Sequence, residues 1–198
     1  MELQGLPESG TDSLTYTIQN IVVKSNLGEK VNLDKIHKSL ESVNYNSNTF
    51  PGLFLRYEDP KCVIIMFQSG KFILTGLLKF EFISVVLQKL VEKLNKRKIC
   101  SKVINSQEIP TEIVNIVVTA NYFKRIDLNL AALRLQNAMY EPEIFPGIIY
   151  KVFNDVSSVY LIFSTGKVVL TGIKEKSLIE KLLINLGKVL KKFNLFLD

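Results

Sequence analysis

The sequence predicts an α+β fold made of two tandem copies of one unit. Three short motifs occur twice in the 198 residues, in the same order both times. A separation of 95 or 96 positions relates the matched pairs Asn20 and Asn115, Phe50 and Phe145, and Lys71 and Lys167. A period near 95 is too long for a solenoid, and two copies are too few. We therefore expect two pseudo-symmetric repeats, at 14–104 and 105–198.

Composition indicates a soluble intracellular protein with an affinity for polyanions. Hydrophobic residues make up 47% of the chain and charged ones 22%, which is enough for a core. The net charge is +6, and the first thirteen residues hold three acids and no base, so the remainder carries 6 + 3 = +9. We expect residues 1–13 to be a disordered acidic tail. No apolar run approaches the roughly 18 residues that span a bilayer.

Each copy reads as a strand, a helix, several short strands and a long helix. Asp59-Pro60 and Asn154-Asp155 mark turns between neighbouring strands, which favours an antiparallel meander. Ser177 and Glu180 form a predicted capping box for the last helix. Its predicted core stripe is Leu182, Leu183, Leu186, Val189, Leu190 and Phe193, matched in the first copy by Phe82, Val85, Val86, Leu90, Val91 and Leu94.

The hairpin around Gly70 decides which side chains share a face of the sheet. A three-residue loop with Gly70 in the left-handed conformation would pair Phe67 with Lys71. One face then carries Ile65, Phe67, Lys71, Ile73 and Thr75, and in the second copy Leu161, Phe163, Lys167, Val169 and Thr171. The other face carries Ile64, Met66, Phe72 and Leu74, and in the second copy Ile162, Val168 and Leu170.

Two interpretations follow from a sheet with two apolar faces. The sheet could be buried on both sides between other layers. Alternatively, one face lies under the helices and the other is open for a ligand. The lysines and threonines on one face favour the second interpretation, because a buried lysine is costly. Duplex DNA is a long, anionic and quasi-symmetric partner that would suit such a face.

Several motifs give the sequence a resemblance to the TATA-box-binding protein (TBP) family over nearly its whole length after the first dozen residues. These are "QNIV", "NIV", "FPG" twice, "YEPEIFPGIIYK", "FQSGK", "FSTGK" and two "LTG" ends. The resemblance implies a saddle with a curved ten-stranded antiparallel sheet and four helices on the convex side. It also implies that the concave side binds the minor groove of TATA-box DNA and bends it.

The resemblance implies a role for each residue of the interface. Pairs of phenylalanine rings would wedge between base steps: Phe50 with Phe67, and Phe145 with Phe163. Asn20, Asn115, Thr75 and Thr171 would donate hydrogen bonds to the acceptors of A·T pairs. The backbone cations would be Arg56, Lys71, Lys151 and Lys167. An apolar floor excluding the guanine amino group would comprise Val22, Ile65, Ile73, Val117, Leu161 and Val169, and the remaining contacts are Pro51, Ser69, Pro146 and Thr165.

The resemblance implies a general transcription initiation factor that nucleates the preinitiation complex in the nucleus. Transcription factor IIB would dock on Tyr140, Glu141, Glu143 and Ile144. Transcription factor IIA and TBP-associated factors are further partners of the family, although few basic residues along the middle of 79–98 weigh against the factor IIA contact. The alternative is a TBP-related scaffold for transcription factors with altered or lost TATA specificity.

Nothing in the sequence predicts an enzyme, a cofactor or a metal. His37 is the only histidine, and Cys62 and Cys100 lie far apart without a metal-type spacing. No phosphate-binding loop of the type GxxxxGK[ST] occurs. Three positions depart from the family pattern, namely Pro51 for Ala, Val114 for Gln and Lys151 for Arg, and these could change affinity or orientation preference.

Overall fold

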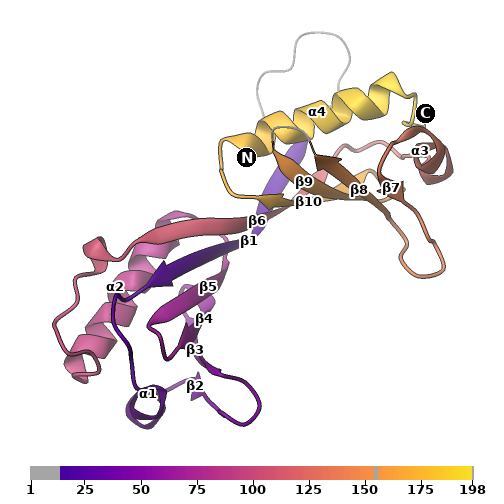
Figure 1. Ribbon diagram of the computed structural model, residues 1–198. Coiled ribbons are helices and arrows are strands. Elements are labelled where there is room, and N and C mark those ends of the chain that lie inside the picture. Colours follow the sequence, from indigo (N-terminus) through magenta and orange to yellow (C-terminus); the bar gives the residue numbers. More distant parts are fainter. Residues whose placement is uncertain (1–13, 154–155, 198) are drawn as a thin grey trace. The chain divides into compact units, whose positions relative to one another are not determined.

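The computed structural model describes residues 14–153 and 156–197 (Figure 1). Within these residues ten strands form one antiparallel sheet in the order β2-β3-β4-β5-β1-β6-β10-β9-β8-β7. The second half of this order mirrors the first, as expected for a duplicated chain. The sheet and the four accompanying α-helices confirm the predicted fold class. The predicted tail at 1–13 and the turn at Asn154-Asp155 lie outside the described residues.

The two copies contain the same kinds of helices and strands in the same order along the chain. The first copy contains β1 (Thr15–Asn26), α1 (Leu33–Ser39), β2 (Val43–Asn44), β3 (Gly52–Glu58), β4 (Lys61–Phe67), β5 (Lys71–Leu77) and α2 (Glu81–Lys96). A short 3-10 turn, η1 (Ser106–Glu108), precedes the second copy. That copy contains β6 (Thr111–Asn121), α3 (Leu128–Arg134), β7 (Ala138–Met139), β8 (Ile148–Phe153), β9 (Ser157–Ile162), β10 (Lys167–Ile173) and α4 (Leu178–Lys192).

Contacts divide the described residues into two compact units. The first unit comprises residues 20–114, and the second comprises 14–19 together with 115–197. Strands β1 and β6 therefore each contribute residues to both units. The repeat boundaries expected from the duplication, 14–104 and 105–198, stay a prediction about the sequence.

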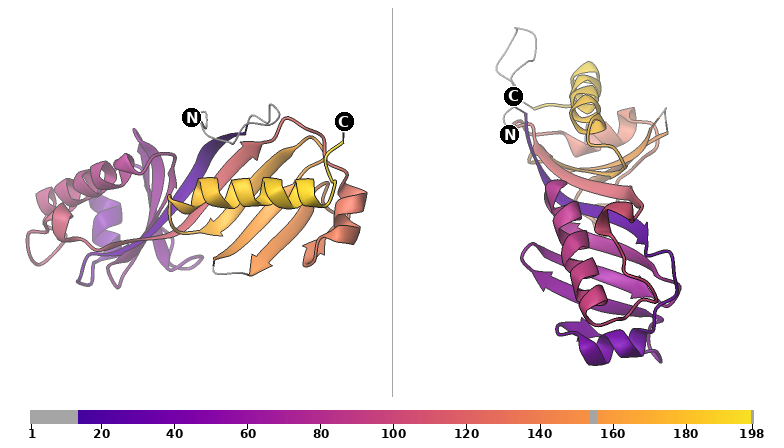
Figure 2. Two further views of the ribbon diagram at one scale, coloured as in Figure 1. Left: turned by 90° about the horizontal axis from the view of Figure 1, so that it is seen from above. Right: turned by 90° about the vertical axis from the view of Figure 1, so that its left-hand side faces the viewer.

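One face of each unit's strands is buried beneath a long helix. Figure 2 shows α2 and α4 each crossing the strands of its own unit. In the first unit the buried strand residues include Leu53, Leu55, Ile64, Met66, Phe72 and Leu74, and α2 covers them with Val86, Leu87, Leu90, Val91 and Leu94. In the second unit Ile148, Tyr160, Ile162, Val168 and Leu170 pack under Ile179, Leu183, Leu186 and Leu190 of α4.

The other face of the strands is only half covered, so the interpretation of a sheet buried on both sides is wrong for the described residues. The hairpin prediction is confirmed: Met66 pairs with Phe72 and Ile65 with Ile73, which sets Phe67 opposite Lys71. Gly70 has φ +82°, and a Cβ there would clash with the carbonyl oxygen of Glu29. We call this half-covered side of each unit the open face.

Two details of the long helices differ from the sequence prediction. Val85 is 40% exposed, and Leu87 is buried in its place, because the helix presents a slightly different stripe to the sheet. The prediction of a capping box at the start of α4 is also wrong. Ser177 has a helical backbone and makes no side-chain capping bond, while Glu180 accepts a hydrogen bond from the Tyr16 hydroxyl at 3.3 Å.

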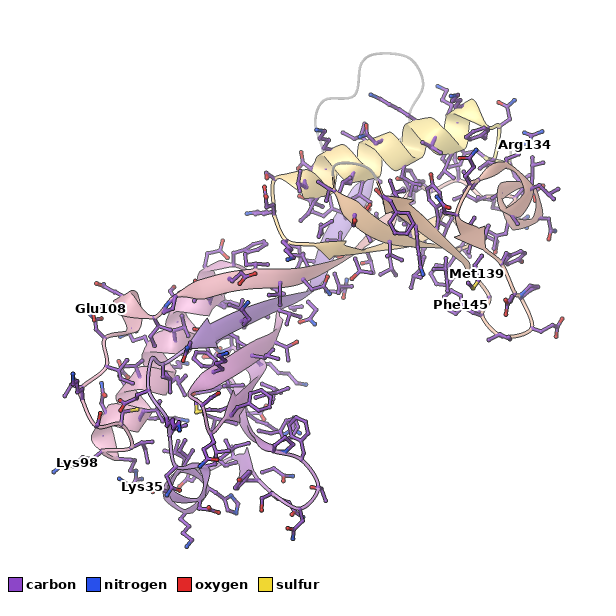
Figure 3. The ribbon with its side chains drawn as sticks, viewed as in Figure 1. Lys35, Lys98, Glu108, Arg134, Met139 and Phe145 are labelled. Atoms are coloured by element: carbon purple, nitrogen blue, oxygen red, sulfur yellow. The ribbon has the colours of Figure 1, made fainter. Side chains whose placement is uncertain are left out.

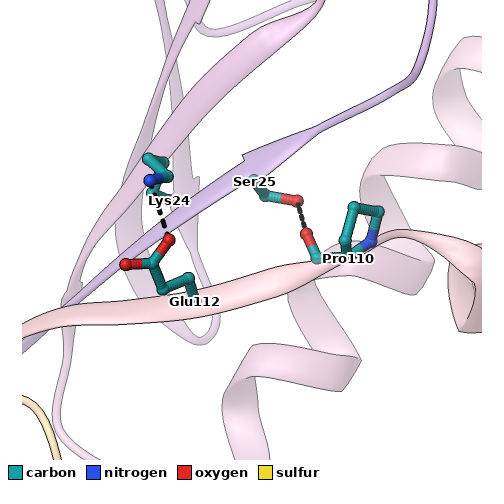
Figure 4. Close-up of polar contacts among 4 residues, drawn as sticks. All are labelled: Lys24, Ser25, Pro110 and Glu112. Atoms are coloured by element: carbon teal, nitrogen blue, oxygen red, sulfur yellow. Dashed lines mark hydrogen bonds and ion pairs between the residues drawn. The ribbon is translucent and has the colours of Figure 1, made fainter.

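Two polar contacts fasten the segment that enters β6 to the end of β1 (Figure 4). The buried Ser25 hydroxyl donates to the carbonyl oxygen of Pro110 at 2.7 Å. Lys24 Nζ lies 2.7 Å from Glu112 Oε2, but both side chains are more than half exposed, so this ion pair adds little stability. Among the described residues, no helix is both long and apolar enough to cross a membrane.

Candidate nucleic-acid interface

A pair of phenylalanine rings lies at one end of the open face in each unit. The centroids of Phe50 and Phe67 are 6.0 Å apart, and those of Phe145 and Phe163 are 5.7 Å apart. Phe50 is 37% exposed, and the other three rings are half-buried. The structure thus brings together each of the two predicted ring pairs.

The glycine of each Phe-Pro-Gly corner makes room for its ring pair. A Cβ at Gly147 would lie 2.9 Å from the Ile162 carbonyl oxygen, 3.0 Å from Phe145 Cε1 and 3.1 Å from Phe163 Cε1. At Gly52 the same atom would lie 2.5 Å from Phe50 Cε1 and 3.1 Å from Phe67 Cε1. Any larger residue would press on both rings of the pair, and in the second unit also on the backbone of β9. The repeated corner is therefore explained by ring packing on the open face.

Phe54 is a third ring of the first unit that the sequence analysis missed. Its centroid lies 5.3 Å from that of Phe50, and the residue is half-buried on the open face. The second copy has Ile149 at the matched position. Alternation along β3 from Arg56 could have placed Phe54 on this face, because side chains two apart share a side of a strand. The two ring clusters are consequently unequal.

A β-bulge in each copy holds an asparagine in a defined orientation. The register between β1 and β5 shifts so that Thr75 and Gly76 both oppose Val22. Gly76 has φ +95°, and its N–H donates to Asn20 Oδ1 at 2.7 Å. The second copy repeats this arrangement, with Gly172 at φ +86° donating to Asn115 Oδ1 at 2.9 Å.

The hydrogen bond from each bulge glycine to its asparagine, called here the bulge bond, distinguishes the oxygen of the side-chain amide from its nitrogen. A backbone N–H can only donate, so the atom facing it must be the carbonyl oxygen of the asparagine. Thr75 Oγ1 and Thr171 Oγ1 also lie 3.2 Å from the same oxygens. The NH₂ group of each amide is then the remaining hydrogen-bond donor, and in the first copy Asn20 Nδ2 lies 3.1 Å from Thr75 Oγ1. Asn20 and Asn115 are half-exposed, and each shares the open face with the apolar residue two positions on.

The predicted apolar floor lies on the open face in both units. Its six residues are half-buried and alternate along the strands with fully buried neighbours: Val22, Ile65, Ile73, Val117, Leu161 and Val169. Cross-strand pairing brings Ile65 opposite Ile73 and Leu161 opposite Val169. No polar side chain of the described residues interrupts these two pairs.

A hollow of about 620 Å³ in the second unit gathers several of the predicted residues. Pro146, Phe163, Thr165, Lys167 and Val169 all line it. Residues that the sequence analysis missed complete the lining, notably Thr15, Thr17, Thr119 and Asn121. Thr17 Oγ1 and Thr119 Oγ1 lie 2.9 Å apart, and Gln19 Nε2 donates to both at 2.8 Å. Their signal was weak, because threonine is a common strand residue.

The four predicted cations are exposed: Arg56, Lys71, Lys151 and Lys167. Lys71 and Lys167 begin β5 and β10, directly after the hairpin turns that hold Ser69 and Thr165. Within the described residues these cations take part in no ion pair, so their charges are available to an anion. Pro51 and Pro146 are also exposed, each beside a ring of its pair.

The acidic segment of the second copy forms a turn between β7 and β8. Figure 3 labels Met139 and Phe145 at its two ends. The N–H groups of Ile144 and Phe145 both donate to the carbonyl oxygen of Glu141 at 2.9 Å. Glu141, Glu143 and Ile144 are exposed, and Tyr140 is half-exposed. The first copy makes the same turn with Asn46 at the matched position and without acids.

The remaining reactive side chains among residues 14–153 and 156–197 form no catalytic arrangement. Burial raises the pKa of the Cys62 thiol to about 11, and burial with the nearby Glu29 carboxylate raises that of Cys100 to about 11. Both thiols therefore stay protonated at neutral pH. His37 is exposed on α1, with its ring 6.4 Å from that of Tyr45. The described residues include no cluster of His, Cys, Asp and Glu that could hold a metal ion.

Comparison with known protein families identifies the family of this chain. The model of the family "Transcription factor TFIID (or TATA-binding protein, TBP)" matches residues 15–97 and again residues 110–193. The chain belongs to the TATA-binding protein family. The two matched stretches confirm the duplication predicted from the motifs, and they include every residue of the two open faces described above.

Individual members of the TBP family resemble the chain over most of its length. The "TATA-box-binding protein" of Pyrodictium occultum is 37% identical over 90% of this chain and 87% of its own. That of Picrophilus torridus is 38% identical over 90% of this chain and 96% of its own. The solved structure of "Methanococcus jannaschii TBP" superposes with a TM-score of 0.78 at 32% identity, covering 90% of this chain and 98% of that one.

These relatives bear on two of the sequence-based expectations. TBP is a transcription factor family, which agrees with the prediction that the chain is not an enzyme. The relatives come from archaea, which have no nucleus, so the expected nuclear location is not supported. Net positive charge favours binding to polyanions in any cell, so it does not indicate a compartment.

Removing both bulge acceptors should destabilise the fold. We expect the double variant Asn20→Ala, Asn115→Ala to lose about 1–3 kcal/mol of unfolding free energy, since each of the two lost hydrogen bonds costs ~0.5–1.5 kcal/mol. Urea denaturation measures this. The matched double variant with Asp at both positions keeps an acceptor for each N–H and should unfold like the wild type. An alanine variant as stable as the aspartate variant would show that the bulge bonds do not matter.

Proposed function

We propose that the chain binds the minor groove of A·T-rich promoter DNA through its open faces, bends the duplex and so initiates transcription. The observation that carries the proposal is the recurrence, in both units, of a ring pair, an apolar floor and a bulge-held asparagine on one half-covered face. Membership of the TATA-binding protein family supports it. The target would be chromosomal DNA.

The chemistry of the open face suits the edges of A·T pairs. In the minor groove these pairs present only the acceptors adenine N3 and thymine O2. The bulge bonds leave the asparagine NH₂ groups as donors, of which that of Asn20 also lies 3.1 Å from Thr75 Oγ1. Thr75 and Thr171 place their hydroxyl groups 3.2 Å from the two asparagine oxygens. A G·C pair adds a donor amino group. That group would lose its water against the apolar floor without gaining an acceptor, which is unfavourable.

The ring pairs provide a means of bending. Insertion of apolar side chains between base steps is the mode by which TATA-binding proteins kink DNA, and it costs the unstacking of a step. An aromatic side chain presents roughly 150–250 Å², worth at most ~4–6 kcal/mol at ~25 cal/mol per Å². The four wedge rings are already partly covered, so the available gain is smaller. Phosphate contacts by Arg56, Lys71, Lys151 and Lys167 would add a salt-dependent contribution.

Sequence preference is the first property to measure. Titration of fluorescent duplexes should show tighter binding to an A·T-rich core than to a G·C-rich core by roughly tenfold or more, since one base contact is worth ~1–3 kcal/mol. Asn115→Asp should keep the fold but weaken A·T binding, because a carboxylate would face acceptors. Equal affinity of the wild type for both duplexes would contradict the proposal and favour a scaffold without TATA specificity.

Bending tests the wedge separately from affinity. Phe163→Ala should reduce the bend of an A·T-rich duplex, measured by energy transfer between dyes at its ends under saturating protein. Phe82→Ala removes a half-buried ring at the start of α2, on the helix-covered side, and serves as the control. A bend that is unchanged by Phe163→Ala would overturn the wedge assignment. A bend that both variants reduce equally would indicate lost stability instead.

We infer that the acidic turn at Tyr140–Ile144 docks transcription factor IIB. Its two carboxylates and the exposed Ile144 side chain, 80% exposed, offer a charged and apolar contact that the first copy lacks. Exposed turns with such side chains are typical of recognition sites. Transcription factor IIA and TBP-associated factors would bind elsewhere, and no contact of the described residues selects their site.

Charge reversal tests the factor IIB site. The double variant Glu141→Lys, Glu143→Lys should weaken retention of factor IIB on the protein–DNA complex by roughly tenfold at low salt and less at high salt, because exposed charges are screened. Gel mobility shift of the ternary complex measures this. Glu41→Lys with Glu175→Lys makes the same charge change at two other exposed acids. Equal loss in both double variants would refute a specific site.

A further inference from the structure

A second hollow of the second unit lies on its helix-covered side, away from the open face. Its volume is about 200 Å³, and it opens between α4 and the strands β8 and β9. Side chains of both layers line it, chiefly Tyr150, Val152, Tyr160, Leu182 and Val189, with Lys181 at its border. None of these residues belongs to the proposed DNA interface.

The first unit shows why the hollow exists. Tyr57 of β3 and Val152 of β8 occupy matching positions, 95 residues apart. Their partners on the next strand, Cys62 and Ser158, match as well, at a separation of 96 residues. Tyr57 is only 7% exposed, and Lys93 Nζ lies 4.5 Å from the centroid of its ring. In the second unit a valine replaces this tyrosine, and Val189 replaces Lys93. The space that the tyrosine ring fills in one copy is therefore left open in the other.

The walls of the hollow are held in place by their own contacts. The rings of Tyr150 and Tyr160 stack with centroids 6.0 Å apart, and the Tyr160 hydroxyl donates to the Leu182 carbonyl oxygen at 3.3 Å. Burial raises the pKa of both phenols, so they stay neutral. Leu186, which also lines the hollow, is buried. The hollow is thus formed before any ligand arrives.

Size and charge together describe the occupant. Small-molecule sites usually measure ~300–1,000 Å³, so 200 Å³ suits a single inserted side chain better than a cofactor. Helix α4 carries four lysines and one glutamate, whereas α2 carries three lysines and two glutamates. Lys181 replaces Val85 of the first copy at the border itself. A largely apolar hollow with Lys181 in its lining, on a helix with three more lysines, complements an apolar side chain flanked by acids.

We propose that this hollow docks an acidic segment of a partner protein, which inserts one aromatic or branched aliphatic side chain between α4 and β8. The carboxylates of the segment pair with Lys181 and the neighbouring lysines of α4. Because the hollow and the open face lie on opposite sides of the second unit, the protein can hold this partner and DNA together. The site goes beyond the proposed function and does not depend on it.

A defined peptide tests the proposal. The probe is a short acetylated peptide with one Phe flanked by Asp and Glu, titrated into the full chain with and without A·T-rich duplex. We expect micromolar-range binding, with chemical-shift changes at the methyl groups of Val152, Leu182 and Val189. A peptide with Asn and Gln in place of the acids, and one with Ala in place of Phe, should each bind at least tenfold more weakly.

Variants of the chain provide the matched controls. Val152→Tyr restores the residue of the first copy and should reduce peptide affinity at least tenfold without lowering the thermal midpoint or DNA affinity. Lys181→Glu should weaken binding several-fold, and Lys96→Glu, the same charge change on α2, should not. No binding, binding that Val152→Tyr leaves unchanged, or shift changes at the first unit instead would each overturn the proposal. Should Val152→Tyr misfold, the methyl shifts of the wild type decide.

Discussion

A hydrogen bond between a backbone N–H at a β-bulge and a side-chain amide recurs in both copies of this protein, and the open face depends on it. Gly76 N donates to Asn20 Oδ1, and Gly172 N to Asn115 Oδ1. Each bond satisfies a donor that the bulge removes from the ladder, and it also turns the amide so that its NH₂ group is left to donate. One contact in each copy therefore both satisfies the bulge N–H and orients the asparagine donor toward the open face.

The second constraint is that each long helix covers only one face of its strands. Apolar residues on both faces would normally require a second layer, as the sandwich interpretation assumed. Here the uncovered side keeps half-buried valines, isoleucines and phenylalanines at the surface, an arrangement that marks a binding face. Because the covered side is packed separately, its hollow under α4 can differ between the copies without disturbing the open face.

Much of this arrangement follows from periodicity, and the rest depends on packing that periodicity does not describe. The hairpin at Gly70 gave the correct pairing of Phe67 with Lys71, and from it the two faces of the sheet. The bulges at Gly76 and Gly172 were not predicted, although a Thr-Gly pair within a strand was a usable signal. Val85 was assigned to the core because helical spacing does not specify the rotation of a helix on its sheet. The hollow beside Val152 could not be predicted, because an alignment of the copies reveals a smaller residue but not whether neighbours close the gap.

The most direct test of the central claim is to change one group of the DNA and nothing in the protein. Inosine presents the same minor-groove acceptors as adenine and differs from guanine only by lacking the amino group. Binding to a G·C-rich core should therefore recover, when inosine replaces each guanine, to within a few-fold of binding to the A·T-rich core. Affinity that stays at the G·C level after this replacement would contradict an interface that reads the groove by oriented donors and an apolar floor.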